Sequence, residues 1–444
     1  MSTTSKQGAT SKQGATSTPS TTSAATAAQA TAAATAATAT SAAQAATPTP
    51  RNSPPANQVQ LAGDTRLLLS GNHAVSYGAM RARPEVVPIY PITPQTPIAE
   101  KISDLQLAGD FDVDLMTAES EHSAMSACIT ASLTGVRVFT ATASQGLMLM
   151  HEMLHYASGA RAPIVMVNVN RTIGSPWGFW PDQTDSLAQR DTGWIQYYTE
   201  NGQESLDTVI QAFKVVEELL VPAMVIHEAF YISHALEPVT VPSQERVDAY
   251  LPPFDPPHRF DPDIGESWGN VVNQEMFCRH RKDLGDAMDR VVEASVRADA
   301  EYREMMGRGY GILEEYRTED AEMLIVAFGA MVGSARVAVD MLRDAGRPIG
   351  LLKIKLFRPF PIAAVRRAVA GVPRLVVMER NFSPGVGGVL HQELKAALYG
   401  MPDPPFIHGY LAGVGGLNVS PKKIVELVDK ALTEEPVPGP VWQR

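Results

Sequence analysis

The stretch Val136–Val169, VRVFTATASQGLMLMHEMLHYASGARAPIVMVNV, decides the fold class of this chain. Its two ends, Val136–Ala143 and Ile164–Val169, are short apolar runs rich in β-branched residues, a composition typical of buried strands. Between them, Leu147–Tyr156 is rich in leucine and methionine, which favours a helix that packs on a sheet. A strand, a helix and a strand in succession predict a parallel pair joined by a crossover helix.

The same alternation continues on both sides of this stretch. Val86–Tyr90 and Met224–His227 are further predicted strands, and Leu206–Leu220 is a predicted helix. A second alternating region has predicted strands at Met323–Gly329, Gly350–Pro361 and Arg374–Asn381, and its GVGGVL segment at 385–390 opens a helix. The sequence therefore predicts an α/β protein with one parallel-sheet domain followed by a smaller doubly wound domain.

Composition and charge narrow the class of protein. The chain has 444 residues, a net charge of −11 and two cysteines, Cys128 and Cys278. An acidic chain lacks the positive surface that nucleic-acid binding needs, so no nucleic-acid partner is expected. Two cysteines are too few for a disulfide framework or for the roughly four ligands of an iron–sulfur cluster, and a cytoplasmic location is expected. No apolar run approaches the roughly 20 residues of a membrane span, so no membrane partner is expected.

Residues 1–60 differ in composition from the rest of the chain. They begin with a tandem repeat, TSKQGATSKQGA (Thr4–Ala15), and no acidic residue occurs before Asp64. Alanine, threonine and serine dominate, and such a segment has few large side chains to bury, which predicts a disordered tail. A targeting peptide is the alternative, but those are rich in arginine and the first arginine here is Arg51.

A linker and helical strap is predicted at residues 241–318. The region around its start is rich in proline, EPVTVPSQERVDAYLPPFDPPHRFDPD, and a charged helix follows at about Asn273–Met306. The two predicted domains flanking this region span residues 65–240 and 319–436.

The motif H-E-x-x-H is formed by His151, Glu152 and His155. On a helix the two imidazoles share one face and can hold zinc, with the glutamate as general base of a peptidase. A third ligand is needed, and the metzincin spacing requires glycine at 158 and histidine at 161, where this chain has Ser158 and Arg161. The alternative, favoured by the surrounding methionine and leucine, is a helix that packs on the sheet. Motifs for nucleotide phosphates and for a hydrolase nucleophile elbow are absent from the sequence.

Three segments follow predicted strands at the carboxyl edge of the first sheet, where open α/β sheets bind ligands. They are YPITPQTP at 90–97, TAESEHSAMSA at 117–127 and NVNRTIGSPWGFWPDQTD at 168–185. Taken singly, each is explained by helix capping, by acidic residues at a helix N-terminus or by a polar surface loop. Together they bring a hydroxyl, a carboxylate and a guanidinium to one edge, which suits an anionic small substrate beside a cofactor.

Several sequence segments, in the same order along the chain, resemble those of one known family. In the first domain they are GNHAVSYGAM, YPITPQTP, SEHSAMSA, TATASQGLMLMHEML and RDTGWIQ, and in the second EEYRTEDAEMLIV, GLLKIKLFRPFP and ERN. From about residue 68 to 435 the chain resembles the α subunit of 2-oxoacid:ferredoxin oxidoreductases, most closely the pyruvate enzymes. The resemblance implies a thiamine diphosphate-binding domain of the pyrimidine type, followed by a domain like the C-terminal domain of transketolase.

The resemblance also implies a set of site residues. Glu121 would hydrogen-bond the pyrimidine nitrogen N1′ of thiamine diphosphate, a contact that favours the imino tautomer of the ring. Thr93 would hydrogen-bond the carboxylate or keto oxygen of the substrate, and the planar guanidinium of Arg171 would suit its carboxylate. The remaining cofactor-binding residues would be Tyr90, Pro91, Ile92 and Gln145.

The implied activity is the oxidative decarboxylation of a 2-oxoacid with coenzyme A, with electrons passing to ferredoxin through iron–sulfur clusters. The diphosphate and Mg²⁺ half of a thiamine site usually contains G-D-G, and the GD pairs at 63, 109 and 285 are not followed by glycine. Partner subunits of the β, γ and δ types would therefore supply the Mg²⁺ and diphosphate half and the clusters, and this chain would be active only in the complex.

Two departures from the family pattern leave the substrate open. The pyruvate enzymes tend to have D-H-x-D where this chain has DQTD at 182–185, and Trp177 and Phe179 are bulkier than the usual aliphatic residues. An aryl or branched 2-oxoacid, such as phenylglyoxylate, is the alternative to pyruvate, and another electron acceptor is possible. A zinc peptidase and a non-catalytic scaffold subunit remain as alternatives of a different class.

Overall fold

The computed structural model describes residues 63–261, 263–265 and 267–443. The predicted tail, residues 1–60, lies outside the described residues. Within the described residues, no helix combines the length and apolar content that crossing a bilayer requires.

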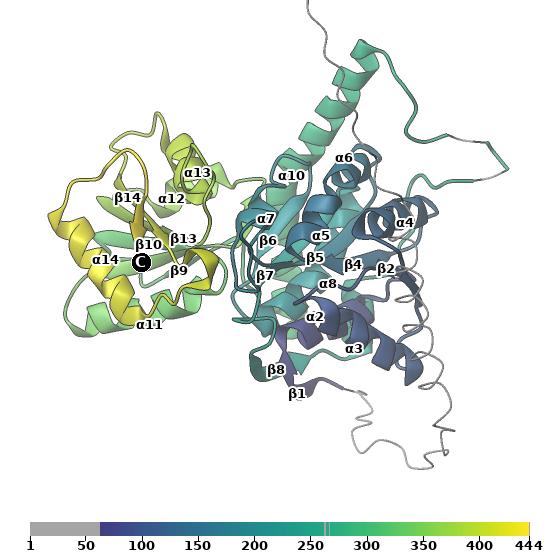
Figure 1. Ribbon diagram of the computed structural model, residues 1–444, viewed down its shortest axis with the longest axis horizontal. Coiled ribbons are helices and arrows are strands. Elements are labelled where there is room, and N and C mark those ends of the chain that lie inside the picture. Colours follow the sequence, from purple (N-terminus) through teal and green to yellow (C-terminus); the bar gives the residue numbers. More distant parts are fainter. Residues whose placement is uncertain (1–62, 262, 266, 444) are drawn as a thin grey trace, which may run out of the picture. The chain divides into compact units, whose positions relative to one another are not determined.

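A seven-stranded sheet forms the first layer of the structure (Figure 1). Neighbouring strands are parallel except for the antiparallel edge strand β12. In sheet order the strands are β12 (Leu356–Arg358), β6 (Ile195–Tyr198), β7 (Ala223–Glu228), β5 (Ile164–Asn170), β4 (Val138–Thr142), β2 (Val86–Ile89) and β3 (Asp114–Thr117). The strands predicted at 86–90, 136–143, 164–169 and 224–227 are therefore present, with ends shifted by one or two residues.

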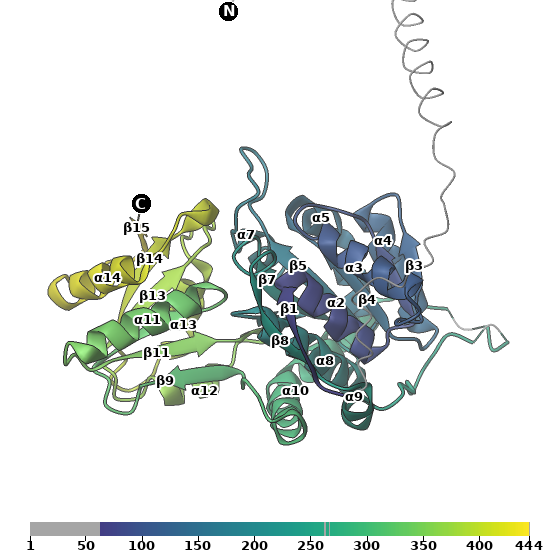
Figure 2. The same ribbon diagram turned by 90° about the horizontal axis from the view of Figure 1, so that it is seen from below.

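Helices cover both faces of this sheet (Figure 2). One face carries α2 (Gly71–Ala82), α3 (Thr96–Leu107) and α8 (Gly202–Leu219), and the other carries α4 (Glu121–Leu133), α5 (Ser144–Leu149) and α6 (His151–Gly159). Along β5, Val165 and Val167 belong to the first core, whereas Ile164 and Met166 belong to the second. Burial on both faces explains why the strands read as continuous apolar runs.

The helix predicted at 147–156 is two helices in the structure. Helix α5 ends at Leu149, and α6 begins at His151 after Met150. The apolar pattern runs through this junction without interruption, so it contained no sign of the break. The helix predicted at 206–220 is α8.

The proline-rich region predicted as a linker begins with a strand. Strand β8 (Leu236–Val241) pairs antiparallel with β1 (Thr65–Ser70) in a sheet of two strands, with Pro238 opposite Leu68. Proline is tolerated there because each strand of such a pair has one free edge. Helix α9 (Gln244–Tyr250) follows, and then α10 (Gln274–Met306), which matches the predicted charged helix.

A six-stranded sheet forms the centre of the second α/β region (Figure 1). Its order is β15 (Val441–Gln443), β14 (Phe406–Ala412), β13 (Arg374–Glu379), β10 (Met323–Ala327), β11 (Ile349–Ile354) and β9 (Leu313–Tyr316), and only β9 is antiparallel. One face packs on α11 (Met331–Asp344) and α14 (Pro421–Thr433), and the other on α12 (Ile362–Ala368) and α13 (Val389–Leu398). The predicted α/β class, with two mostly parallel sheets, is confirmed.

The single strand predicted at 350–361 was wrong. The segment forms two strands in different sheets: β11 lies in the six-stranded sheet, and β12 pairs antiparallel with β6 of the seven-stranded sheet. The chain therefore crosses between the sheets at Lys355. Both strands are buried, so their apolar residues form one uninterrupted run in the sequence.

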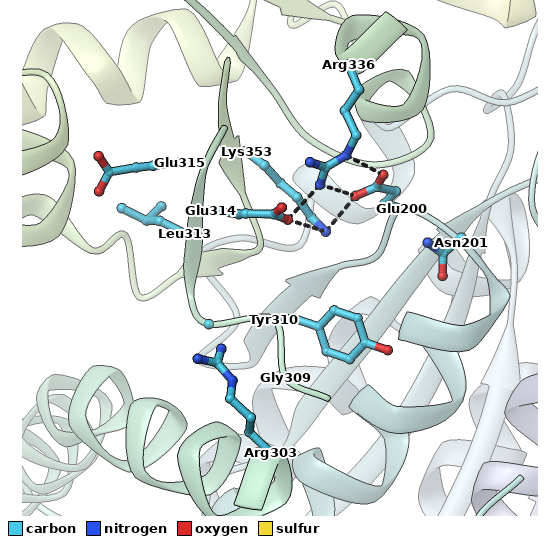
Figure 3. A pocket seen from close by; sticks show the side chains of 11 residues that line it. Glu200, Asn201, Arg303, Gly309, Tyr310, Leu313, Glu314, Glu315, Arg336 and Lys353 are labelled. Carbon is cyan, nitrogen blue, oxygen red and sulfur yellow. Dashed lines mark hydrogen bonds and ion pairs between the residues drawn. The ribbon is translucent and has the colours of Figure 1, made fainter. Parts of the chain in front are cut away.

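Buried charges join the two sheets next to this crossing. Lys353 on β11 is 1% exposed, and its Nζ lies 2.8 Å from the carboxylate of Glu200, which follows β6 (Figure 3). The guanidinium of Arg336 on α11 lies 2.9 Å from Glu200 and 2.6 Å from Glu314 on β9. These residues line a cavity of about 580 Å³. Lys353 and Arg336 at this cavity are thus already paired with carboxylates.

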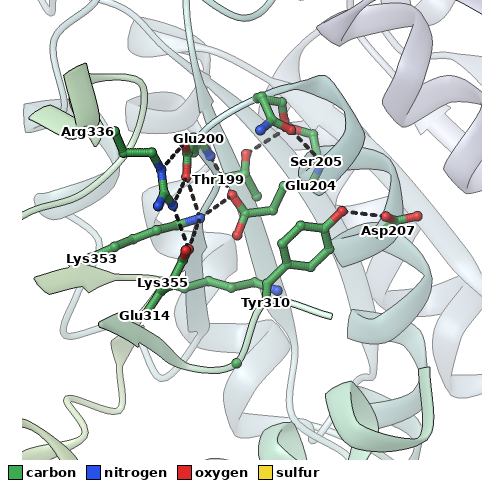
Figure 4. Close-up of polar contacts among 12 residues, drawn as sticks. Thr199, Glu200, Glu204, Ser205, Asp207, Tyr310, Glu314, Arg336, Lys353 and Lys355 are labelled. Carbon is green, nitrogen blue, oxygen red and sulfur yellow. Dashed lines mark hydrogen bonds and ion pairs between the residues drawn. The ribbon is translucent and has the colours of Figure 1, made fainter. Parts of the chain in front are cut away.

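Glu204 on α8 completes the network (Figure 4). Its buried carboxylate lies 2.8 Å from Nζ of Lys353 and accepts a hydrogen bond of 2.8 Å from the backbone N–H of Glu200. Burial alone lowers the pKa of Lys353, but the carboxylates of Glu204 and Glu200 outweigh it and the pKa is raised. Burial raises the pKa of Glu200, yet Arg336 and Lys353 outweigh burial and lower it. Both shifts favour the charged forms of Lys353 and Glu200 at neutral pH.

We expect Lys353→Met to lower the free energy of unfolding by about 3 kcal/mol, because removing one partner leaves buried carboxylates without a counter-charge. Denaturant unfolding of the purified protein measures this loss. Lys282→Met is the matched control, since the Lys282 side chain is 72% exposed beside Asp286 and its loss should change little. Equal effects of the two substitutions would contradict the expectation.

Candidate functional site

The residues proposed from the sequence gather at one edge of the seven-stranded sheet. Thr93 follows β2, Glu121 follows β3, Gln145 follows β4 and Arg171 follows β5. These four strands are neighbours and parallel, so their carboxyl ends meet at the same edge. Ligands bind at this edge in open α/β sheets.

Arg171 connects two of the other predicted residues. One terminal nitrogen of its guanidinium donates to the carbonyl oxygen of Thr93, and the other donates to Oε1 of Gln145. Its Nε is buried and has no hydrogen-bond partner in the described part of the protein. Arg171, Thr93 and Gln145 therefore form one connected group from three strand ends.

The turn after β2 presents the Thr93 side chain. The peptide bond between Thr93 and Pro94 is cis, and Thr93 is exposed. Its hydroxyl makes no hydrogen bond among the described residues, and Tyr90, Pro91 and Ile92 lie in the same turn. The structure thus places an exposed side chain with a hydroxyl on the residue whose carbonyl oxygen accepts from Arg171.

Glu121 is the first residue of α4, where Ser120 is the N-cap. It is 6% exposed, and its carboxylate has no hydrogen bond or ion pair to any described residue. The neighbouring Glu119 differs, since it is exposed and bonds Oγ of Ser123 at 2.5 Å. A buried polar group without a hydrogen-bond partner costs free energy, so this carboxylate is available to a donor from outside the chain.

The surroundings of Glu121 fit the pyrimidine ring of thiamine diphosphate. A Cβ atom on Gly146 would lie 2.5 Å from Oε1 of Glu121 and 2.6 Å from Oγ1 of Thr142, so only glycine fits at this position. The Thr142 hydroxyl is buried and has no partner within the described residues. Glu121 thus offers an acceptor without a protein donor, which the N1′ position of an aminopyrimidine requires.

Asp185 organises the strand ends behind these side chains. Its buried carboxylate accepts hydrogen bonds from the backbone N–H of Ser144 at 2.9 Å and of Arg171 at 3.3 Å. The side-chain amides of Asn168 and Asn170 donate to it at 3.2 and 2.5 Å. Burial raises the pKa of the Asp185 carboxyl to about 6, although these donors favour the ionised form. One carboxylate therefore fixes the turn after β4 and the end of β5.

Two aromatic side chains cover Arg171. Its guanidinium lies 5.4 Å from the ring centre of Trp177 and 5.8 Å from that of Phe179, and the two rings meet edge to face at 5.1 Å. Both rings are substantially exposed. The bulky residues that depart from the family pattern thus contact the arginine rather than fill the interior.

The H-E-x-x-H motif has another arrangement. His151 and His155 share one face of α6 with ring centres 5.1 Å apart, and Nδ1 of His151 lies 2.5 Å from Oε1 of Gln189. The side chain of Glu152 is 71% exposed and lies 3.7 Å from His122. Across the described ranges, no group of three or more His, Cys, Asp or Glu side chains could hold a metal ion.

Two family models match the chain. Residues 77–299 match the thiamine diphosphate-binding domain of pyruvate flavodoxin/ferredoxin oxidoreductases, and residues 321–424 match core domain II of pyruvate:ferredoxin oxidoreductase.

Named relatives agree with these matches. Pyruvate synthase subunit PorA of Methanothermobacter thermautotrophicus is 44% identical over 377 residues, which cover 84% of this chain and 97% of that protein. Ketoisovalerate oxidoreductase subunit VorA of Pyrococcus furiosus is 44% identical over 368 residues, which cover 82% of this chain and 93% of that protein. The solved structure of 2-oxoglutarate:ferredoxin oxidoreductase from Magnetococcus marinus has a similar fold, with a TM-score of 0.66 at 21% identity, covering 83% of this chain and 65% of that chain.

The fold and the matched thiamine diphosphate-binding domain define the chain as a subunit of an oxidoreductase. It belongs to the α-subunit family of the 2-oxoacid:ferredoxin oxidoreductases. Its relatives are named as subunits, so further subunits complete the enzyme.

We expect Asp185→Asn to raise KM for the 2-oxoacid by about tenfold or more, because an amide nitrogen would face donors that now meet a carboxylate oxygen and small displacements of Arg171 impair binding. Steady-state kinetics of the assembled enzyme measures the change. Asp191→Asn is the matched control, since its side chain is 78% exposed. An unchanged KM in a folded Asp185→Asn enzyme would contradict the role assigned to Asp185.

Proposed function

We propose that this chain carries the pyrimidine-binding half of a thiamine diphosphate site that oxidatively decarboxylates pyruvate. Coenzyme A would accept the acyl group, and electrons would pass to ferredoxin through iron–sulfur clusters of partner subunits. The observation that carries the proposal is the nearly buried, unpartnered carboxylate of Glu121 on the same sheet edge as Arg171 and Thr93.

Each residue has a role that follows from its surroundings. Thiamine diphosphate, when bound, supplies the nucleophilic carbon and the electron sink for decarboxylation. Glu121 holds the proton at N1′ of the pyrimidine, and burial strengthens that contact. Arg171 presents a guanidinium, and Thr93 a hydroxyl, to the carboxylate end of the substrate. Gln145 and the Tyr90–Ile92 turn line the cofactor.

The division of the chain into domains is part of the same proposal. We assign residues 65–240 to the pyrimidine-binding domain, 241–318 to the linker and helical strap, and 319–436 to the transketolase C-terminal-like domain. The second matched region, 321–424, lies within the last of these segments, whereas the first, 77–299, continues beyond residue 240 into the strap.

Partner subunits would complete the site. No GD pair of this chain is followed by glycine, and its two cysteines are too few for a cluster. We therefore assign the Mg²⁺ and diphosphate half, and the clusters, to subunits of the β, γ and δ types.

A branched 2-oxoacid is the second candidate substrate. VorA, a ketoisovalerate enzyme subunit by name, is as similar to this chain as PorA, at 44% identity each. An aryl 2-oxoacid is a further alternative, suggested by the two aromatic side chains at 177 and 179.

Glu121→Gln should lower kcat of the assembled enzyme by about 100-fold or more, since a neutral amide does not stabilise the proton at N1′ and proton-transfer catalysis contributes about that much. Acceptor reduction with pyruvate and coenzyme A measures kcat. His155→Ala serves as the control on the zinc alternative and should retain activity. Normal turnover by Glu121→Gln would instead favour a scaffold role for this chain.

The substrate is tested by assaying the purified complex with pyruvate, 2-oxoisovalerate and phenylglyoxylate. We expect pyruvate to give the largest kcat/KM, because the pyruvate synthase subunit PorA is 44% identical to this chain over 97% of its own length. A larger kcat/KM with the branched or the aryl acid would replace pyruvate by that acid. Absence of thiamine diphosphate from the active complex would overturn the proposal as a whole.

A further inference from the structure

We propose that Asn72 is a positioning residue that holds the turn carrying Thr93 and so sets the place of the substrate-binding hydroxyl. The inference rests on the proposed function, because it depends on the role of Thr93 in substrate binding. Asn72 lies on helix α2, whereas the candidate site residues follow the ends of strands.

Asn72 makes two hydrogen bonds through its side chain. It is fully buried as the second residue of α2, and its Nδ2 donates to the carbonyl oxygen of Pro94 at 2.7 Å. Its Oδ1 lies 3.1 Å from Nε2 of His227 at the end of β7. A buried amide is costly unless both of its ends are paired, and here both are.

The partners determine which way the amide faces. The carbonyl oxygen of Pro94 can only accept, so the nitrogen of Asn72 must face it and the oxygen must face His227. His227 therefore carries its proton on Nε2. Burial lowers the pKa of His227 to about 3, so the ring is neutral at physiological pH and the donor is permanent.

The turn is held from two sides at consecutive carbonyl groups. Arg171 donates to the carbonyl oxygen of Thr93, and Asn72 donates to that of Pro94. Gln95 closes the turn, since its backbone N–H donates to the carbonyl oxygen of Ile92 at 2.7 Å. The backbone of Thr93 is thus fixed while its hydroxyl has no partner within the described residues, which is the arrangement expected of a group kept for a ligand.

The test uses the assembled enzyme with Asn72→Asp, Thr93→Val and the double variant. Asn72→Asp keeps an acceptor for His227 but removes the donor to Pro94. We expect each single variant to raise KM for pyruvate, and Kd for the unreactive analogue oxamate measured by calorimetry, by about tenfold, the loss expected for a hydrogen bond to a charged group. The double variant should have the same KM and Kd as Thr93→Val alone, because both changes remove the contact between the Thr93 hydroxyl and the ligand.

Asn273→Ala is the matched control. It removes an asparagine that holds a backbone N–H, that of Met276 at 2.9 Å, at the start of α10, and it should leave KM and Kd unchanged. Asn72→Ser, which shortens the side chain, replaces Asn72→Asp if the latter does not assemble, and its coupling to Thr93→Val is measured in the same way.

The outcomes separate the inference from the proposed function. If Thr93→Val leaves KM and Kd unchanged, the proposed role of Thr93 fails and the inference fails with it. If Thr93→Val weakens binding but the Asn72 variant does not, or if the two effects multiply in the double variant, only the inference is overturned.

Discussion

The buried carboxylate of Asp185 is the interaction on which the candidate site depends. A charge removed from water must be surrounded by donors, and here the donors come from the turn after β4 and from the end of β5. Satisfying this one group therefore fixes Ser144 and Arg171 relative to each other. Gln145 follows Ser144 directly, so the contact between Gln145 and Arg171 is a consequence of the same constraint. Burial raises the pKa of the Asp185 carboxyl to about 6, and the surrounding donors oppose this rise.

The charged side chains around Lys353 and the candidate side chains at the edge of the seven-stranded sheet differ in their partners. Around Lys353, the lysine and Arg336 meet carboxylates from both sheets, as expected of a group of residues that fixes structure. Along the edge of the seven-stranded sheet, by contrast, the Glu121 carboxylate, the Thr142 hydroxyl and Nε of Arg171 have no protein partner within the described residues. Buried polar atoms without a partner also occur elsewhere among the described residues, Oε1 of Glu204 included, so it is their position at neighbouring strand ends that points to a ligand. Lys353 and Arg336, which line the cavity of about 580 Å³, already form ion pairs, so this cavity points to a bound ligand less than the sheet edge does.

Sequence patterns predicted β2, β4, β5 and β7 of the seven-stranded sheet because these strands consist of apolar runs, but they did not predict β3 or β6. They also predicted the edge at which the candidate side chains meet, since parallel strands place the loops that follow them together. The patterns failed at β11 and β12, where one apolar run contains two strands that belong to different sheets. They also failed at β8, where a strand contains proline. The sequence did not predict roles for Asp185 and Asn72, because their hydrogen-bond partners lie in other loops or strands. Periodicity carries no information on such contacts.

The aromatic residues 177 and 179 illustrate how geometry changes the meaning of a sequence difference. Bulk at these positions suggested either a narrow pocket or a stacking partner for an aryl substrate. In the structure both rings lie over the guanidinium of Arg171, at centre distances of 5.4 and 5.8 Å. An aromatic face attracts a cation and shields it from water, so these rings act first on the arginine. Shielding strengthens the attraction between the guanidinium and a carboxylate, which every 2-oxoacid carries. Under the proposed role of Arg171, the two rings would strengthen binding of the common carboxylate, and a large substrate side chain is not needed to account for them.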